Sequence, residues 1–452
     1  MGIYENLLDS IKFSKQDKNC RRTMGRTEKN RRKKKKKIPK PLEDLSTIEQ
    51  LESWMKSVGW TPSTNMKPTI FPVTHRGLIT LENISPDTPL VKIPKELLIT
   101  PSVAWNSNVK SIFIEKNGYT GHSVLATFLL YEKHLGTTST WKHYLDSLPN
   151  SYTTPSYCTK MERNIMPFYM RQQTNILLQR MIVDYQSILK SIHQLKINCN
   201  DLCTHCLMSL PEIFTFEAFK WSYFTVNTRA IYMRDSNFIN GGNIHKDDNL
   251  ALAPFLDLLN HSFDAIVDVK PINNTFDESY QIYTSKAIQK NSQVFINYGN
   301  HCTLKLYVEY GFFIPNNPLD EIFIDYLFIS KYKKISELKN KYILRNDFHE
   351  NIGFTSQGLN YRAKISFFII CTTLKIIEMR DKIYCDNLNY RDELTSNIFS
   401  CKILNIERLK LMKDLKRMKS QINKSDSFKI GIDVQKEHIS ILDKCFNRMF
   451  YK

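Results

Sequence analysis

Apolar and polar positions alternate along this chain with two different periods, and the period changes four times. In residues 44–58 apolar side chains recur every three or four positions, which predicts a helix. Ser46, followed by Glu49 three residues later, has the spacing of a capping box at its start. Residues 69–100 hold short apolar runs separated by proline and by Gly77, which is typical of strands. The first 100 residues are therefore predicted to form one helix and then a β-rich segment.

Helical periodicity dominates residues 120–225 and returns beyond residue 330. The clearest stripe of the first segment consists of Leu178, Ile182, Tyr185, Leu189 and Ile192. The clearest face of the second consists of Leu404, Leu411, Leu415, Met418 and Ile422. Between them, residues 250–314 alternate as strands do; the alternating sets are Tyr280, Ile282 and Thr284, then Val294, Ile296 and Tyr298. The order β, α, β, α predicts an α+β fold in which a helical insertion, at about residues 101–225, splits a β-rich unit that precedes an all-α C-terminal domain.

The net charge of +18 is concentrated at the N-terminus of the 452-residue chain. Residues 1–40 hold 15 Lys and Arg against four Asp and Glu, so they carry +11 and the other 412 residues carry +7. The run at residues 31–37 is typical of a nuclear-import signal or of an arm that binds polyanions, and a solvated tail that aids solubility is the third interpretation. We expect residues 1–43 to be a basic disordered tail, nucleic acid to be bound only through it if at all, and the protein to be located in the nucleus, the cytoplasm or both.

The composition excludes several classes of protein. Hydrophobic residues make up 42% and aromatic residues 12% of the chain, which is too much for a disordered chain. Glu5 and Asp9 interrupt any signal peptide at the N-terminus. The longest apolar stretch, at residues 365–377, includes Thr372 and Lys375, so we expect a buried helix and no membrane partner. Ten cysteines without a secretory signal indicate reduced thiols in the cytosol or nucleus.

Three cysteines form a compact cluster. Cys199, Cys203 and Cys206 have the spacing C-x3-C-x2-C of the ligands to a radical iron–sulfur cluster, and His205 would suit a zinc site instead. No repeated βα units surround them, so unliganded thiols in a polar loop are favoured, and we expect no metal. The sequence contains no phosphate-binding glycine motif and no nucleophile elbow.

Polar and aromatic residues are densest in the second β-rich segment. Each short motif there is compatible with ordinary packing, and only the order and spacing of the motifs together are specific. They are His75-Arg76-Gly77-Leu78, Trp141-x-x-Tyr144-Leu145-x-x-Leu148-Pro149, Asn227-Thr228-Arg229-Ala230, Asp257-x-x-Asn260-His261-Ser262, Phe295-Ile296-x-Tyr298-Gly299 and Glu309-Tyr310-Gly311-Phe312. In this combination, residues 45–315 resemble the SET-domain methyltransferases of the Rubisco large-subunit methyltransferase-like class.

This resemblance implies a fold and a reaction. The fold is a split SET domain at residues 44–318, followed by a helical substrate-binding domain at residues 319–452. The reaction is transfer of a methyl group from S-adenosylmethionine to a lysine side chain of a protein substrate, histone or non-histone, by an enzyme that we expect to be a monomer. A free lysine, with a pKa near 10.4, is almost fully protonated at neutral pH, so the site needs apolar walls, a fixed hydroxyl and no strong base.

The resemblance assigns the reaction to two tyrosines. Tyr298 is implied to be the catalytic residue, with its hydroxyl beside the transferred methyl group. Tyr310 is implied to bind the substrate by lining the lysine channel, where its ring faces an ammonium group. Asn297 before Tyr298, and Asn300 and His301 after it, depart from the pattern of the class, and we expect these departures to change only the surface of the loop.

The resemblance implies that the adenine end of the cofactor lies on the motif Asp257-x-x-Asn260-His261-Ser262. Asn260 and His261 hold the adenine, partly through backbone groups, Asp257 supports that turn, and Phe312 packs against the ring. The methionine end lies on other segments. The backbone of Arg76, Gly77 and Leu78 approaches it closely, which suits a glycine. Arg229 is implied to pair with its carboxylate, as guanidinium geometry favours. Tyr298 also contacts the cofactor.

Two other functions remain open. In the histidine-methylating branch of this class the position of Tyr310 is commonly replaced, so keeping the tyrosine favours lysine over histidine as the target. The second alternative is an inactive adaptor bound to chromatin or RNA, against which the joint presence of Asn260, His261, Tyr298 and Tyr310 speaks. The sequence does not identify the protein substrate, the lysine or the number of methyl groups added.

Overall fold

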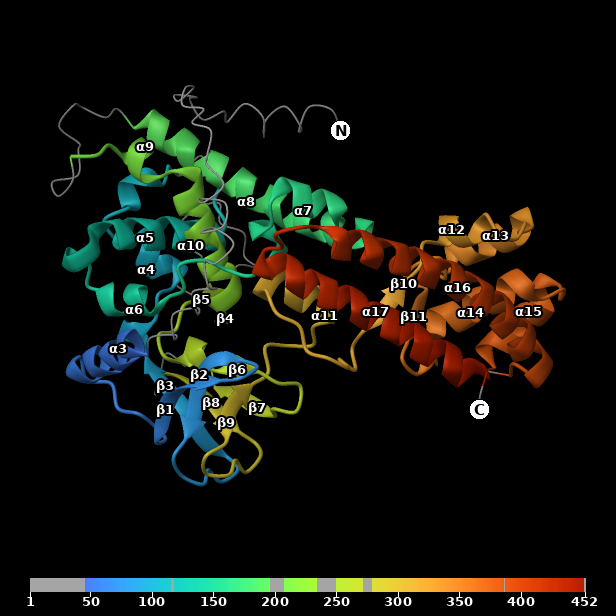
Figure 1. Ribbon diagram of the computed structural model, residues 1–452, viewed down its shortest axis with the longest axis horizontal. Helices are drawn as coiled ribbons and strands as arrows, with labels where there is room; N and C mark the ends of the chain where they lie inside the picture. Colours follow the sequence, from blue (N-terminus) through green and yellow to red (C-terminus); the bar gives the residue numbers. More distant parts are fainter. Residues whose placement is uncertain are drawn as a thin grey trace, which may run out of the picture. The chain divides into compact units, whose positions relative to one another are not determined.

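Two hydrophobic cores organise the described part of the chain. The computed structural model describes residues 45–114, 118–195, 207–233, 249–270, 279–385 and 387–450. Within the compact unit Leu45–Lys452, one core joins the β-rich segments to the helices inserted between them, and the second lies in the C-terminal region. The predicted basic tail and the Cys199, Cys203 and Cys206 cluster lie outside the described residues. The predicted α+β class is confirmed (Figure 1).

The first helix, α3 (Ser46–Ser57), confirms the helix predicted near the start of the body. Its predicted capping box is wrong. Leu45 already has helical backbone angles, and its carbonyl accepts from the amides of Ile48 and Glu49 at 3.0 Å, so Ser46 is inside the helix and not at its cap. Val58, which was predicted on the apolar face, follows the helix and is 53% exposed.

The central sheet brings the two ends of the split domain together. Its strands lie in the order β1-β2-β9-β6. Their bounds are Met66–Phe71, His75–Thr80, Gln293–Ile296 and Asn260–His261, respectively. The hairpin β1–β2 pairs antiparallel with β9, and β6 pairs parallel with β9. Residues some 200 positions apart are therefore neighbours in one sheet, which carries the motifs that begin at His75, Asp257 and Phe295.

Further strands pack beside this sheet. A three-stranded sheet has the order β3-β8-β7, formed by Thr88–Pro94, Ser279–Thr284 and Val267–Lys270. A short pair joins β4 and β5, formed by Ile231–Tyr232 and Leu250–Ala251. The strand predicted from Tyr280, Ile282 and Thr284 is present and all three are buried, but Gln281 between them is buried too, so the alternation is incomplete.

The insertion is helical, as predicted. Its helices are α4 (Pro101–Trp105), α5 (Gly121–Leu135), α6 (Lys142–Ser147), α7 (Lys160–Ile165), α8 (Phe168–Gln194), α9 (Leu210–Ile213) and α10 (Phe216–Arg229). A capping box between Thr120 and Ser123 begins α5, which packs along α10. Figure 1 shows α5, α6 and α10 together on one side of the strands.

The apolar stripe predicted on α8 is displaced by about one position. The buried residues are Met170, Thr174, Leu177, Met181, Ile188, Ser191 and Ile192. Of the predicted stripe only Ile192 is fully buried, and the other members flank the buried face. The buried face of α8 differs from the predicted stripe because it includes two polar residues, Thr174 and Ser191. Thr174 donates its hydroxyl to the carbonyl of Met170 at 2.7 Å, so it can be buried, which hydropathy alone does not reveal.

The C-terminal region is helical, as predicted. Its helices are α12 (Tyr326–Ser330), α13 (Glu337–Arg345), α14 (Tyr361–Cys371), α15 (Ile376–Tyr384), α16 (Tyr390–Ser420) and α17 (Asp426–Phe450). A short sheet accompanies them, with strands β10 (Glu321–Phe323), β11 (Gly353–Thr355) and β12 (Gly358–Leu359). The predicted buried helix is α14. Ile422 was wrongly placed on the face of α16, since that helix ends two residues earlier and Ile422 is 78% exposed. Within the described ranges, no helix has the length and apolar character needed to cross a bilayer.

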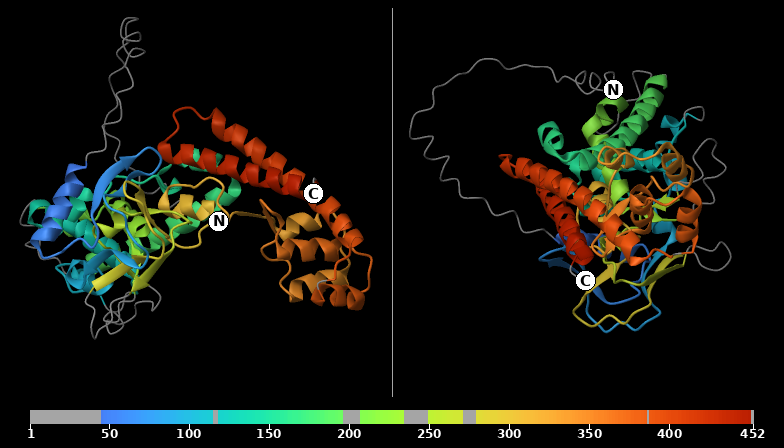
Figure 2. Two further views of the ribbon diagram at one scale, coloured as in Figure 1. Left: turned by 90° about the horizontal axis from the view of Figure 1, so that it is seen from below. Right: turned by 90° about the vertical axis from the view of Figure 1, so that its right-hand side faces the viewer.

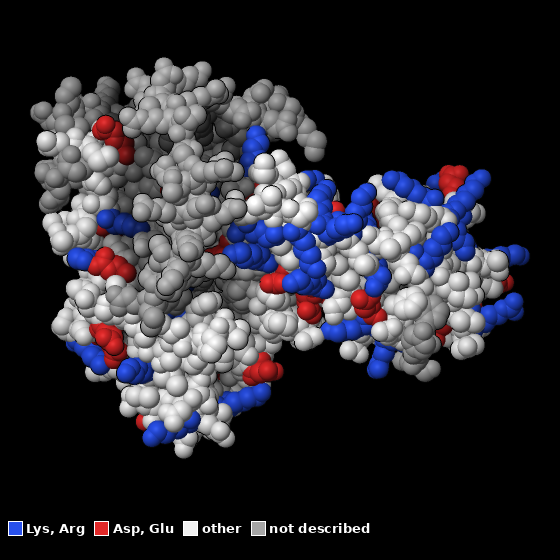
Figure 3. Space-filling view, viewed as in Figure 1, with Lys and Arg blue, Asp and Glu red and all other residues white. Residues whose placement is uncertain are grey.

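Helix α17 ties the C-terminal region to the SET-like part. Tyr307 donates its hydroxyl to the carbonyl of Ser427 at 2.9 Å, and Tyr169 donates to Gln435 Oε1 at 2.5 Å. Figure 2 shows α16 and α17 running side by side. Residues 319–452 hold 25 Lys and Arg against 17 Asp and Glu, a net +8, so the charge outside the tail belongs to this region. Figure 3 shows these cations over α16 and the start of α17.

Candidate active site

Four aromatic rings meet where the central sheet ends. Tyr298 follows β9, and His261 belongs to the neighbouring parallel strand β6. The ring centroids of Tyr298 and His261 are 5.1 Å apart, and those of Tyr298 and Tyr310 are 5.4 Å apart. Phe312 lies 6.3 Å from Tyr298 and 6.2 Å from Tyr310. Four residues predicted from three motifs therefore form one cluster, and three of them keep part of their surface exposed.

A tight turn holds Tyr310 and Phe312 in this cluster. Tyr310 ends a π-helical turn, η7 (Leu306–Tyr310), and Gly311 follows it in the left-handed conformation at φ +83°. A Cβ on Gly311 would lie 2.7 Å from Thr153 Oγ1, which donates to the Gly311 carbonyl. Asn227 of α10 donates its side-chain amide to the carbonyl of Glu309 at 2.7 Å. The helical insertion thus fixes the turn from the other side.

The hydroxyl of Tyr298 is fixed and neutral. It donates to the carbonyl of Leu259 at 2.7 Å, while the Tyr298 amide donates to His261 Nδ1 at 3.1 Å. Burial of the hydroxyl raises the pKa of Tyr298 well above its usual range. The phenol therefore remains protonated at neutral pH and offers an oriented hydroxyl instead of a base.

The His261 imidazole is a neutral hydrogen-bond donor. Burial lowers its pKa to about 4, and because Nδ1 accepts from Tyr298, the proton is carried by Nε2. This Nε2 is buried and has no partner among the residues that the structure describes. The same is true of Gln293 Nε2 and Arg229 Nε. Buried donors are normally satisfied, so these orphaned donors suit a polar ligand.

Asn260 and Gly77 are in direct contact. Asn260 donates its side-chain amide to the carbonyl of Arg76 at 2.9 Å. A Cβ on Gly77 would lie 2.7 Å from both Asn260 Nδ2 and Gln293 Nε2, so a larger residue here would have to displace these two amide groups. Leu78 is fully buried and pairs with strands on both sides. The fold therefore brings residues 76–78 into contact with Asn260, although the two were assigned to opposite ends of the cofactor.

Arg229 and Asp257 form a buried ion pair that the sequence did not predict. Arg229 donates to Asp257 Oδ2 at 2.9 Å, and the Asp257 side chain is 1% exposed. Tyr144 donates its hydroxyl to the same oxygen at 3.0 Å. Burial opposes the charge of Arg229, but Asp257 together with Tyr152 and Tyr144 outweighs it, and the pKa of the guanidinium is raised. Since this nitrogen is already bound, the pairing of Arg229 with a cofactor carboxylate stays a prediction.

His301 corrects one prediction. It was expected only to alter the surface of a loop, but its ring is half-buried and stacks on Tyr310, with centroids 5.7 Å apart and planes at 27°. Tyr144 and Gln293 were also missed as neighbours of the site. For His301, the one available signal in the sequence was its position just after the Tyr298-Gly299 motif. No local feature of the sequence indicated that Gln293 would lie near the site.

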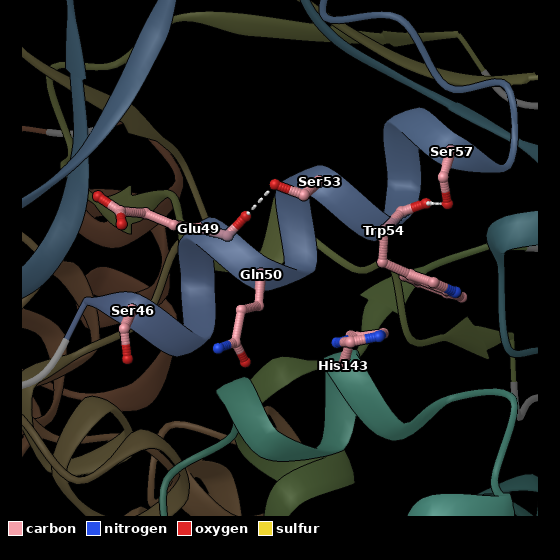
Figure 4. Close-up of a pocket in the computed structure, with 7 residues that line it drawn as sticks. All are labelled: Ser46, Glu49, Gln50, Ser53, Trp54, Ser57 and His143. Atoms are coloured by element: carbon pink, nitrogen blue, oxygen red, sulfur yellow. Dashed lines mark hydrogen bonds between the residues drawn. The ribbon is translucent and has the colours of Figure 1, made fainter.

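A surface hollow of about 440 Å³ lies apart from the cluster, between α3 and α6. Its lining residues are Ser46, Glu49, Gln50, Ser53, Trp54, Ser57 and His143 (Figure 4). The predicted site residues do not line it. Across the described ranges, no three His, Cys, Asp or Glu residues are grouped as metal ligands are.

Comparison with known proteins identifies similar sequences and a similar fold. A family model described as the SET domain matches residues 75–299. SET domain-containing protein 4 of Artemia parthenogenetica is 30% identical, over 89% of this chain and 96% of that protein. A crystal structure described as the SET domain of LSMT, bound to lysine and AdoHcy, aligns with a TM-score of 0.59 at 18% identity, covering 90% of this chain and 92% of that one.

More distant relatives carry two different activities in their names. The ribosomal lysine N-methyltransferase set11 of Schizosaccharomyces pombe is 24% identical, over 63% of this chain and 66% of that protein. The actin-histidine N-methyltransferase of Drosophila melanogaster is 25% identical, over 62% of this chain and 51% of that protein. The family match, the near full-length relative and the split fold agree with the resemblance seen in the sequence. The chain therefore belongs to the SET-domain family.

Proposed function

We propose that the protein is an S-adenosylmethionine-dependent methyltransferase that methylates the side-chain amine of lysine in a protein substrate. The observation that carries this proposal is the cluster of Tyr298, Tyr310 and Phe312 around one fixed, neutral hydroxyl. Aromatic walls disfavour the charged form of an amine. An oriented hydroxyl without a strong base suits a reaction whose nucleophile is already neutral.

The residues around the cluster fit the cofactor. Its ring and amino-acid ends need buried donors and a close backbone approach; the orphaned nitrogens of His261, Gln293 and Arg229 supply the donors, and Gly77 beside Gln293 supplies the approach. When bound, S-adenosylmethionine supplies an electrophilic methyl group on a positively charged sulfur. Asn260, His261 and Phe312 would hold the adenine end, with Asp257 behind them. Residues 76–78 and Arg229 would hold the amino-acid end.

The protein's own contribution is orientation. Tyr298 is held at its hydroxyl by Leu259 and at its amide by His261, so its position is set from two sides. Tyr310 packs against it and provides the wall of a lysine channel. Holding a nucleophile in line can contribute on the order of 7–11 kcal/mol to lowering a barrier. We therefore assign most of the catalysis to placement in a site with little water.

Tyr310 favours lysine over histidine as the target, and histidine methylation is the alternative that the Drosophila relative's name supports. The test is incubation with labelled S-adenosylmethionine and separate fractions of ribosomal proteins, actin and histones, followed by mass spectrometry of the labelled residue. We expect methyl-lysine. Methyl-histidine would support the alternative, and a protein that binds no cofactor would support the inactive adaptor.

Replacing Gly77 with alanine is expected to weaken the binding of S-adenosylhomocysteine at least tenfold, or by about 1.4 kcal/mol. The new Cβ would displace Asn260 and Gln293, which lie 2.7 Å from it. Calorimetric titration measures the affinity. Thr69→Ala is the matched control, because Thr69 pairs with Gly77 across β1 and β2 and its hydroxyl donates to the Lys67 carbonyl at 3.4 Å instead of to those amides. Equal affinities in the wild type and in Gly77→Ala would remove Gly77 from the cofactor site.

The substrate-binding role of residues 319–452, the monomeric state, a histone substrate, nucleic-acid binding through the tail and the nuclear or cytoplasmic location all stay predictions. The +8 charge of residues 319–452 supports a protein substrate with an acidic surface near its target residue. Loss of methylation at 0.5 M salt, with cofactor binding retained, is the expected sign of such docking.

A further inference from the structure

Lysine methylation requires that a proton leave the site, and this inference rests on that proposed function. A bound lysine arrives mostly as an ammonium ion. The groups at the centre of the cluster are poor carriers for its proton. The Tyr298 hydroxyl is already donated to Leu259, and His261 has its Nδ1 occupied and a buried Nε2. Burial raises the pKa of Tyr310 to about 12, so it holds its own proton unless an acceptor stands next to it.

His301 is such an acceptor. Its Nε2 lies 3.5 Å from the hydroxyl of Tyr310, at the long limit of a hydrogen bond, and the two rings are stacked. His301 is half-buried, so part of its surface remains accessible to solvent. Hydrogen bonding of this length tightens readily when a substrate binds.

The position of the His301 ring is fixed by its neighbours. Asn317 donates its side-chain amide to the His301 carbonyl at 2.9 Å. On the other side is Gly299, whose φ is +120°, and a Cβ there would lie 3.1 Å from the imidazole. The glycine of the Tyr-Gly motif therefore makes room for this ring. A side chain that acts on Tyr310 is expected to be held in place in this way, whereas a solvated loop residue is not.

Partial burial keeps the His301 imidazole mostly neutral. Burial and the cation of Lys305 lower the pKa of His301, while Glu309 and the backbone of Asn300 and Tyr298 act in the opposite direction. The net direction is downward from 6.5, so at pH 7 the ring is mostly unprotonated and can accept a proton. As the pH falls below this pKa the ring becomes charged, and it can then neither accept a proton nor tolerate an ammonium ion nearby.

We propose that His301 is the proton outlet of the active site. An N–H bond of the substrate ammonium breaks, and its electron pair stays on nitrogen as the lone pair that attacks the methyl group. The proton passes to the hydroxyl oxygen of Tyr310 while the Tyr310 O–H proton passes to His301 Nε2. The imidazolium then releases a proton to water. Tyr310 ends unchanged, and no further reactant is consumed.

Two variants separate proton transfer from packing. His301→Ala removes the ring and leaves space for a small base, whereas His301→Phe keeps a stacked ring without an acceptor. In both, the single-turnover rate of methyl transfer at pH 7 is expected to fall on the order of 100-fold. Imidazole at 50 mM should restore much of the rate to His301→Ala and none to His301→Phe. His193→Ala, at an exposed position on α8, is the control.

A measurement without turnover is available in the same protein. Nitrogen-15 spectra of the histidine rings should show an unprotonated Nε2 on His301 at pH 7, and Tyr310→Phe should shift that signal. S-adenosylhomocysteine affinity checks that each variant is folded. The proposal is overturned if His301→Phe keeps the wild-type rate, which leaves stacking as the role, or if imidazole fails to rescue His301→Ala. A wild-type protein that methylates no lysine overturns the proposed function instead.

Discussion

Tyr298→Phe is expected to slow methyl transfer about 100-fold, the loss typical of removing one oriented polar group from a catalytic site. The variant keeps the ring that packs on His261, Tyr310 and Phe312, so the aromatic walls survive. It loses the hydroxyl that is held by the carbonyl of Leu259. The affinity for S-adenosylhomocysteine should change little, because the buried donors of the cofactor site are untouched. Single-turnover rates and calorimetry measure the two quantities.

Tyr280→Phe is the matched control for this loss. The hydroxyl of Tyr280 also donates to a backbone carbonyl, that of Tyr232 at 3.1 Å, and its side chain is buried in β8 away from the cluster. Removing it should cost about 1 kcal/mol of stability and leave the rate unchanged. A Tyr298→Phe variant that binds the cofactor and turns over at the wild-type rate would show that Tyr298 only packs.

The sequence predicted the fold through local periodicity. Strands and helices occur in the predicted order because each needs only the alternation of side chains along its own length. Details that depend on other segments were missed. Thr174 joins the buried stripe of α8 because its hydroxyl bonds to its own helix, and Leu45 begins α3 one residue early. The parallel pairing of β6 with β9 has no local signature either.

The candidate site shows the same division. The motifs identified Tyr298, Tyr310 and Phe312, and the fold brings them together. Motif matching did not identify the partners that hold them, because a partner such as Leu259 contributes only a backbone carbonyl. His301 was assigned to the loop surface because sequence alone does not show that Gly299 leaves room for its ring. The sequence identified residues that belong to the site, but it did not show in which direction each side chain points.

Asp257→Ala is expected to lower the free energy of unfolding by about 3–5 kcal/mol, the usual cost of breaking a buried ion pair by removing one partner. The change strands the guanidinium of Arg229, which retains its proton even when buried, and leaves the Tyr144 hydroxyl without its acceptor. These groups connect α10 and α6 to the turn at Asp257 that precedes Asn260 and His261. The cofactor site should therefore loosen when their contacts are lost. Urea denaturation followed by fluorescence measures the loss.

Two comparisons decide whether the loss comes from the stranded charge. Asp433→Ala breaks an ion pair with Lys436 at the surface, where the Asp433 side chain is 43% exposed, and should cost less than about 1 kcal/mol. The triple variant Asp257→Leu, Arg229→Leu, Tyr144→Phe removes all three polar partners together. It should be more stable than Asp257→Ala alone, because no buried group is left unpaired. If the triple variant is less stable than the single one, the three residues contribute net attraction, and their role is to hold the fold together instead of positioning the turn.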